Sequence, residues 1–253
     1  MGKESAIQWT DATWNIAVGC KKVDGDCKFC YMYRDSMDGT RFNPRTIRQT
    51  KTVFNLPLKL KEPKKIFTSS YTDFALPEID PYRAKVWEII RACPHHTFQM
   101  LTKRPERLPE ILPLDWGMGY KNVWLGTSVG NDKAVERIEK LCQVDAEVRF
   151  VSFEPLWTRL TDCIPVDYSD GSPCINWAII GGESGNDRGP YKYRECKLEW
   201  IEHLIQQCRD AGVPVFVKQL GTYLAKQLKL SDRHGGNIEE WPAHLRIREF
   251  PKV

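Results

Sequence analysis

The sequence has no apolar run of about 18 residues, so none of its segments is predicted to cross a membrane. Residues 1–10 lack the apolar core of a signal peptide, and we therefore expect a soluble, cytoplasmic protein. Internal repeats and low-complexity tracts are also missing, which argues against a solenoid or a disordered chain. A strong charge of one sign is missing too. The 37 Lys and Arg against 33 Asp and Glu give a net charge of +4, which is compatible with a nucleic-acid partner but does not indicate one.

Cysteine, by contrast, is abundant, with nine residues in a chain of 253. A reducing compartment does not favour disulfides, and the number is odd, so metal or redox chemistry becomes the question to follow. The length fits one α/β barrel or at most two small domains. With 42% apolar and 28% charged residues, the composition is that of a globular protein.

Short apolar runs alternate with helical patterns along the chain. The runs are near-continuous, as expected for parallel strands that are buried on both faces, and they cover residues 65–69, 97–102, 122–127, 148–153, 177–180 and 213–218. If the segment before Cys20 is counted as a first strand, the sequence predicts seven strands. Apolar stripes predict helices over residues 83–93, 131–142 and 197–211, the last ending at Gly212.

This alternation is typical of right-handed βαβ units, which build either a doubly wound sheet or a barrel. Polar residues gather directly after each predicted strand, and barrels keep their sites at that end. We therefore predict an α/β fold, a complete or partial (β/α) barrel, as a single domain over residues 1–253. Residues 221–253 show little periodicity and are expected to form a C-terminal extension.

Three cysteines lie close together in the order C-x6-C-x2-C, namely Cys20, Cys27 and Cys30, in a loop that contains Gly and Asp. Close-set thiolates suit iron or zinc. A structural zinc site needs a fourth ligand, and no second C-x2-C pair is present. Three thiolates with one open metal position suit a 4Fe-4S cluster that binds a small molecule. Zinc, or simply clustered reduced thiols, remain the alternatives, and the other six cysteines are expected to be structural.

The chain resembles the radical S-adenosylmethionine superfamily, and more closely the phage-associated three-cysteine-motif family, to which no reaction is assigned. Phe29 and Tyr31 flank the last cysteine of the motif, as in radical enzymes. The matching segments are residues 14–15, 19–20, 27–31, 69–74, 101–107, 123–129, 149–156, 181–185 and 216–221. Gly130 departs from the pattern, because a glutamate is expected there. The Gly-Gly-Glu triplet also departs, because it follows the sixth predicted strand rather than the second.

The resemblance implies a barrel whose three motif cysteines ligate three irons of a 4Fe-4S cluster. S-adenosyl-L-methionine would chelate the fourth iron through its amino and carboxyl groups, and reduction would yield a 5′-deoxyadenosyl radical that abstracts hydrogen from a substrate. Such an enzyme needs an electron donor such as a flavodoxin or a ferredoxin. The cofactor carries this chemistry, while the barrel orients the reactants and excludes water.

The resemblance also assigns candidate S-adenosylmethionine contacts at the predicted strand ends. For the methionine end they are Ser69, Ser70 and Asp73, for the ribose hydroxyls Thr127, Ser128 and Glu154, and for the adenosine Gly181, Gly182 and Glu183. Each has a structural alternative. Asp73 could cap a helix, Glu154 could pair with a basic neighbour, and the two glycines could form only a tight turn.

Three basic residues are candidates for substrate binding. Lys103 and Arg104 follow a predicted strand and could contact a phosphate or carboxylate at the barrel mouth, and Lys218 ends the last strand. Lys218 could equally be buried with a carboxylate. We expect a radical enzyme that modifies a nucleic acid or nucleotide. The alternatives are a zinc-stabilised, non-catalytic nucleic-acid-binding barrel, or a radical enzyme acting on a peptide or small metabolite.

Overall fold

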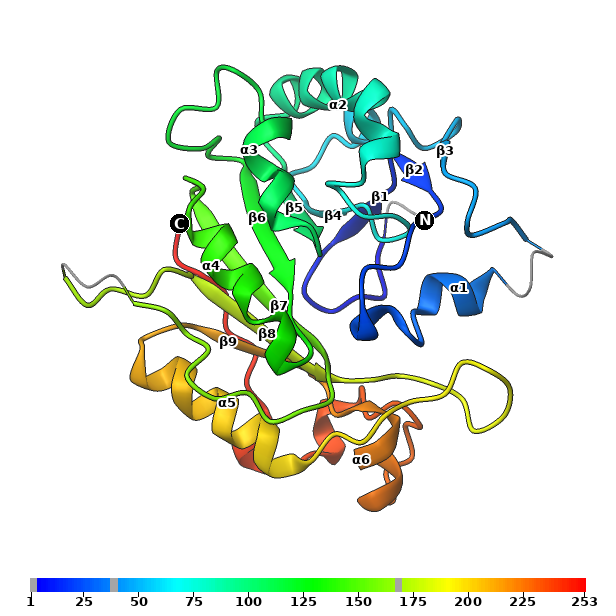
Figure 1. Cartoon of the computed structure of the whole chain (residues 1–253), viewed down its shortest axis with the longest axis vertical. Helices are drawn as coiled ribbons and strands as arrows, with labels where there is room; N and C mark the ends of the chain where they lie inside the picture. Colours follow the sequence, from blue (N-terminus) through cyan, green and yellow to red (C-terminus); the bar gives the residue numbers. More distant parts are fainter. Residues whose placement is uncertain (1–3, 37–40, 167–169) are drawn as a thin grey trace.

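The computed structural model describes residues 4–36, 41–166 and 170–253. Its centre is a seven-stranded parallel sheet in the order β1-β4-β5-β6-β7-β8-β9, curled into a half-barrel (Figure 1). The strands are β1 (Ala12–Trp14), β4 (Lys65–Thr68), β5 (Thr97–Thr102), β6 (Val123–Ser128), β7 (Val148–Leu156), β8 (Trp177–Gly182) and β9 (Val215–Gln219). All seven overlap the predicted strands, and the mixed α/β, barrel-like architecture is confirmed in its partial form.

The three predicted helices are present. They are α2 (Asp80–Ala92), α4 (Glu136–Cys142) and α5 (Leu198–Asp210). Asn131 accepts a hydrogen bond from the Lys133 N–H at 3.0 Å, which opens a short 3-10 turn before α4. Gly212 follows α5 with a φ of +71°, the left-handed conformation expected of a residue that ends a helix.

Several short elements escaped the prediction because they span too few residues to show a period. The helices are α1 (Tyr31–Asp35), α3 (Leu108–Ile111) and α6 (Gly221–Gln227), and the strands β2 (Ala17–Val18) and β3 (Arg48–Gln49) form an antiparallel pair. The 3-10 turns are η1 (Gly25–Cys27), η3 (Pro57–Lys59), η4 (Pro77–Ile79), η5 (Pro105–Arg107), η6 (Asp132–Ala134), η7 (Ile238–Glu240) and η8 (Ala243–Leu245). None of the described helices is long and apolar enough to cross a membrane.

Buried apolar side chains form two clusters between the sheet and the helices, and a third on the inner face of the half-barrel. The third consists of Trp9, Phe67, Trp124, Val148, Phe150, Trp177, Ile179 and Phe216. Most of these residues come early in their strands, so they fill the amino-terminal end of the barrel. Trp177 is central, since its ring centre lies 5.8 Å from that of Trp124 and 6.2 Å from that of Trp9. These side chains therefore close the amino-terminal end of the barrel interior.

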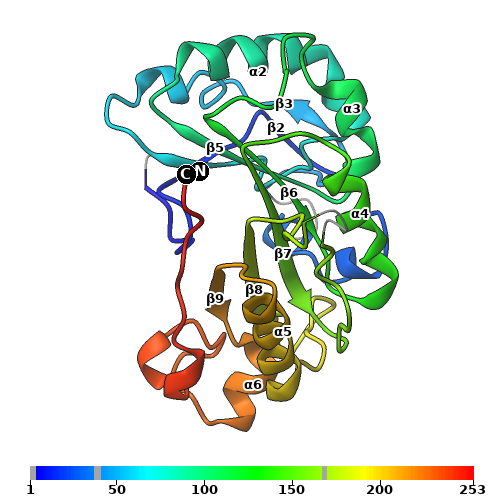
Figure 2. The same cartoon turned by 90° about the vertical axis from the view of Figure 1, so that its left-hand side faces the viewer.

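The C-terminal residues are built into the fold. Trp241 and Leu245 are buried in the cluster that contains α5 and β9. Beyond them, the Val217 N–H donates to the Ile247 carbonyl at 2.9 Å, so the segment covers the free edge of β9. Figure 2 shows this segment (red) running from the α6 side of the molecule to the opposite half, where Nζ of Lys65, the first residue of β4, lies 5.1 Å from the Phe250 ring centre. The Phe250 ring ends the path, stacked on Trp177 with ring centres 5.2 Å apart.

Candidate functional site

A cavity of about 370 Å³ opens at the carboxyl ends of the strands. All three motif cysteines line it, although they come from a loop that precedes most of the sheet in the sequence. The predicted site residues that share this lining are Ser69, Ser70, Asp73, Lys103, Arg104, Ser128, Glu154, Gly182, Glu183 and Lys218. The structure thus brings the cysteines and most of the predicted strand-end residues to one place.

Thr127 and Gly181 do not line this cavity. Thr127 is fully buried and its hydroxyl donates to the Thr102 carbonyl at 2.9 Å, because alternate residues of a strand face opposite sides and its neighbour Ser128 faces inward. Gly181 has a different role. A Cβ at this position would lie 2.5 Å from Glu154 Oε1, so glycine lets that carboxylate approach the strand. Thr127 and Gly181 therefore do not face a ligand bound in this cavity.

The cysteine loop begins directly after β2. Gly19 has a φ of +98°, and a Cβ there would lie 2.5 Å from the Thr46 carbonyl oxygen, so only glycine fits before Cys20. Burial, together with the nearby Asp73 carboxylate, raises the pKa of the Cys20 thiol to about 12. Burial also raises the pKa of Cys30. Both thiols are therefore protonated at neutral pH, and a bound metal would have to displace their protons.

The donor set fits a three-thiolate centre. No disulfide involves any of the three cysteines, and all of them face the cavity. Within residues 4–36, 41–166 and 170–253, no three Cys, His, Asp or Glu side chains already converge on one metal position. The fit therefore depends on the chemistry of the thiols and on their common cavity, and Cys20, Cys27 and Cys30 are the residues that would hold a cluster.

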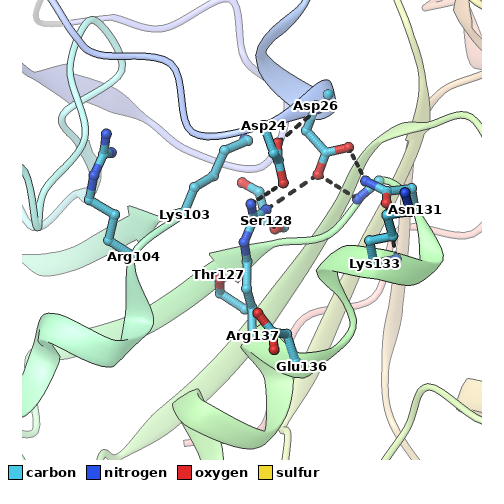
Figure 3. Close-up of polar contacts among 12 residues, drawn as sticks. Asp24, Asp26, Lys103, Arg104, Thr127, Ser128, Asn131, Lys133, Glu136 and Arg137 are labelled. Carbon is cyan, nitrogen blue, oxygen red and sulfur yellow. Dashed lines mark hydrogen bonds and ion pairs between the residues drawn. The ribbon is translucent and has the colours of Figure 1, made fainter.

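A buried carboxylate fixes the cysteine loop to the sheet (Figure 3). The Asp26 side chain is 0% exposed and accepts hydrogen bonds from Asn131 Nδ2 and Trp157 Nε1, both at 2.7 Å. The Gly130 N–H and Arg137 Nη1 also donate to it, at 3.1 and 3.3 Å. Arg137 pairs with Asp24 as well, so the loop between the first two cysteines is held against the ends of β6 and β7.

The structure explains why position 130 departs from the expected glutamate. A Cβ on Gly130 would overlap the Pro155 carbonyl oxygen and lie 2.7 Å from Asp26 Oδ1. No side chain fits there. The carboxylate at this place comes instead from the cysteine loop, as Asp26, and glycine at 130 makes room for it.

Three predicted carboxylates, those of Asp73, Glu154 and Glu183, each pair with a cationic side chain. Asp73 accepts from the Thr102 hydroxyl at 2.6 Å, from the Lys103 N–H at 2.8 Å and from Arg104 Nη1 at 2.9 Å. Lys218 Nζ lies 2.9 Å from Glu154 Oε1, the pairing that was the structural alternative for both residues. Asp73 therefore joins the loops after β4 and β5 rather than offering free oxygens to a ligand, and Arg104 is committed to Asp73.

Glu183 pairs with Arg194, a residue that sequence reasoning missed. Arg194 donates from Nε at 2.9 Å and from Nη2 at 2.7 Å to the two Glu183 oxygens. It also donates to the Gly25 carbonyl at 2.8 Å and lies 4.4 Å from the Trp157 ring centre. Arg194 thus connects the end of β8 to the cysteine loop. It lies in an irregular segment between β8 and α5, where no periodicity pointed to it.

Two hydroxyls of the loop after β4 are buried without a partner among the described residues, those of Ser69 and Thr72. Ser69 is 3% exposed and has a φ of +74°, an uncommon conformation for a residue other than glycine. Ser70 is held differently, because Asn15 Nδ2 donates to its hydroxyl at 2.9 Å. Unpaired buried polar groups at a cavity are places where a ligand supplies the missing hydrogen bond.

Fold and site together define a class: a parallel half-barrel α/β protein with a thiol-lined cavity at the carboxyl ends of its strands. The chain belongs to a family described as "Protein of unknown function (DUF5131)", whose model matches residues 4–243. No curated protein and no solved structure matches it. The family description names no activity.

Proposed function

We propose that the protein is a radical S-adenosylmethionine enzyme, in which Cys20, Cys27 and Cys30 hold a 4Fe-4S cluster. The observation that carries the proposal is the meeting of these three thiols with strand-end polar residues around one cavity. When bound, the cluster and S-adenosyl-L-methionine would supply a carbon radical able to remove hydrogen from a substrate. The resemblance of the chain to radical enzymes over most of its length supports the same assignment.

The protein's own groups would bind and orient the reactants. Ser69 and Ser70 stand at the end of β4 for the methionine end of S-adenosylmethionine, and Ser128 at the end of β6 for the ribose. The paired carboxylates have a positioning role, since Asp73, Glu154 and Glu183 each fix a neighbouring cation. The closed floor of the barrel would keep water from the reacting groups.

For the substrate we propose a nucleic acid or nucleotide, with an electron donor such as a flavodoxin or ferredoxin and a cytoplasmic location. Lys103, a basic residue of the cavity lining, supports an anionic substrate. A peptide or a small metabolite is the competing substrate class. Deuterium transfer from a labelled candidate into 5′-deoxyadenosine would decide between them.

The test of the proposal begins with anaerobic purification and assay of iron and sulfide. We expect a coloured protein that, with dithionite, converts S-adenosylmethionine to 5′-deoxyadenosine. Cys27→Ala should abolish both properties. Cys174→Ala, which alters a cysteine outside the cavity, should preserve them.

Two results would contradict the proposal. A colourless protein that contains zinc would favour the zinc-stabilised, nucleic-acid-binding barrel. A reconstituted cluster that leaves S-adenosylmethionine intact would count against enzymatic function.

A further inference from the structure

One cationic side chain of the cavity lining has no carboxylate partner among the described residues. Each acidic side chain of the lining has a basic partner, in the pairs Asp26–Arg137, Asp73–Arg104, Glu154–Lys218 and Glu183–Arg194. Two further lining cations are paired outside it, Lys21 with Glu78 and Arg34 with Asp35. Among the described residues, Lys103 is the lining cation with no carboxylate within ion-pair distance. Figure 3 shows its side chain extending from the end of β5 toward the segment of Asp24 and Asp26.

Unpaired hydroxyls line the same cavity as this ammonium group. The Lys103 N–H donates to Asp73, which places the loop after β5 directly against the loop that carries Ser69 and Thr72. Both hydroxyls lack a partner among the described residues, and both residues line the cavity. Because Ser69 is assigned to S-adenosylmethionine, the Thr72 hydroxyl and a lysine with no carboxylate partner are left in this cavity as a site for an anionic oxygen group such as phosphate or carboxylate.

The deep end of the same cavity has the opposite character. Its lining there consists of Ile7, Trp9, Phe67 and Leu101, all of which belong to or pack against the aromatic cluster of the barrel floor. Trp9 Nε1 is also buried without a partner among the described residues, which leaves one donor on an otherwise apolar surface. Such a surface suits a flat ring that carries a hydrogen-bond acceptor.

The register of β5 sets the separation between the two ends. Gln99 Nε2 donates to the Trp9 carbonyl at 3.2 Å, so Trp9 lies at the level of Gln99. Leu101 and Lys103 follow on the same inward face, and four residues of a strand span about 13 Å. A molecule that reaches both ends therefore has a ring at one end and an anionic group at the other, separated by a spacer such as a sugar.

We infer that this cavity is a nucleotide-binding site, in which the phosphate contacts Lys103 and the base lies on the floor formed by Trp9, Phe67 and Leu101. The inference deepens the proposed function and rests on it for the chemistry that follows binding. It identifies a single nucleotide as the part of the substrate that enters the barrel.

The test is isothermal titration calorimetry on the full-length protein, purified anaerobically, with the four ribonucleoside 5′-monophosphates and the four nucleosides. For the base that binds, we expect the monophosphate to bind about tenfold more tightly than its nucleoside. Lys103→Gln should remove this difference, and Lys103→Arg should retain it. Leu101→Ala should weaken the nucleotide and the nucleoside by the same factor. Lys121→Gln, the same change on an exposed lysine outside the cavity, should alter neither.

Three outcomes would overturn the inference: no binding of any monophosphate, equal binding of nucleotide and nucleoside, or retention of the phosphate preference in Lys103→Gln. The third outcome, together with weaker binding of S-adenosylmethionine, would assign Lys103 to the carboxylate of that molecule. Iron content and 5′-deoxyadenosine formation are measured on the same preparations. A cluster without nucleotide binding overturns this inference alone, whereas nucleotide binding without a cluster overturns only the proposed radical chemistry.

Discussion

The two ends of the half-barrel are built from different interactions. The amino-terminal end is closed by aromatic and aliphatic side chains packed around Trp177, which is 0% exposed. The carboxyl end is lined by ion pairs such as Glu154–Lys218 and Glu183–Arg194. Apolar packing is non-directional and tolerates small shifts, whereas charge-assisted hydrogen bonds fix orientation. The closed end therefore provides stability and the open end provides placement, and substitutions at the two ends should have different consequences.

The largest effect should come from the closed end. Trp177→Ala removes the ring at the centre of the aromatic cluster and should lower the free energy of unfolding by about 3–5 kcal/mol. Denaturant unfolding measures this loss. In the fraction that remains folded, the content of the proposed cluster should match the wild type, since no ligand-facing group changes. A loss of metal without a loss of stability would contradict the division between the two ends.

Asp26→Asn should have the next largest effect, at the open end. It keeps the shape of the side chain but removes the charge opposite Arg137, whose side chain is 7% exposed, and should cost about 2–3 kcal/mol. Unlike Trp177→Ala, it should also loosen the cysteine loop, so that Cys20 and Cys27 react faster with an alkylating reagent in the folded protein. Asp145→Asn, at a half-exposed carboxylate outside the cavity, is the matched control. Unchanged alkylation would mean that Asp26 does not position the loop.

Gly130→Ala tests the same contact by steric means. The added methyl group would overlap the Pro155 carbonyl oxygen and crowd Asp26, at a cost of about 1–3 kcal/mol. Thermal unfolding measures the effect, with retention of the proposed cluster as a second readout. Gly236→Ala serves for comparison, since its Cβ would meet only side-chain atoms, Asp232 Oδ2 at 3.2 Å and Gln8 Nε2 at 4.0 Å. Wild-type behaviour of both variants would show that the loop has room to move.

Phe250→Ala should have the smallest effect. Phe250 packs on Trp177 but is 37% exposed, so about 1 kcal/mol is expected. Chemical denaturation is again the measurement. A loss as large as that of Trp177→Ala would show that the C-terminal segment, rather than the strands, carries the stability of the closed end.

Sequence reasoning located the strands, the main helices and the cysteine cavity, because each depends on a local pattern. Buried parallel strands give continuous apolar runs, and their carboxyl ends lie together whatever the details of the loops. The contacts between residues of the site could not be predicted from the sequence. Asp26 meets Gly130 across 104 positions and Trp157 across 131, and Arg194 reaches Gly25 across 169. All of these contacts lie between loops, where no period relates one residue to another.

The ion pairs also explain why residue type alone misjudged some roles. Asp73, Glu154 and Arg104 have the chemistry of ligand-binding groups, and each lines the cavity. Each is nevertheless satisfied by another protein group, which only the three-dimensional arrangement reveals. Lys103 carries the same sequence signal as Arg104 beside it, yet among the described residues only Arg104 has a carboxylate partner.

The segment that covers β9 affects how readily the protein associates with other chains. An open half-barrel has two edge strands, and an uncovered edge is a template for pairing with another chain. The backbone bond of Val217 with Ile247 and that of Glu249 with Val215 occupy the free side of β9. The chain thereby supplies its own partner for that edge. Removing residues 247–250 would expose the edge of β9. We expect the shortened protein to self-associate before it unfolds.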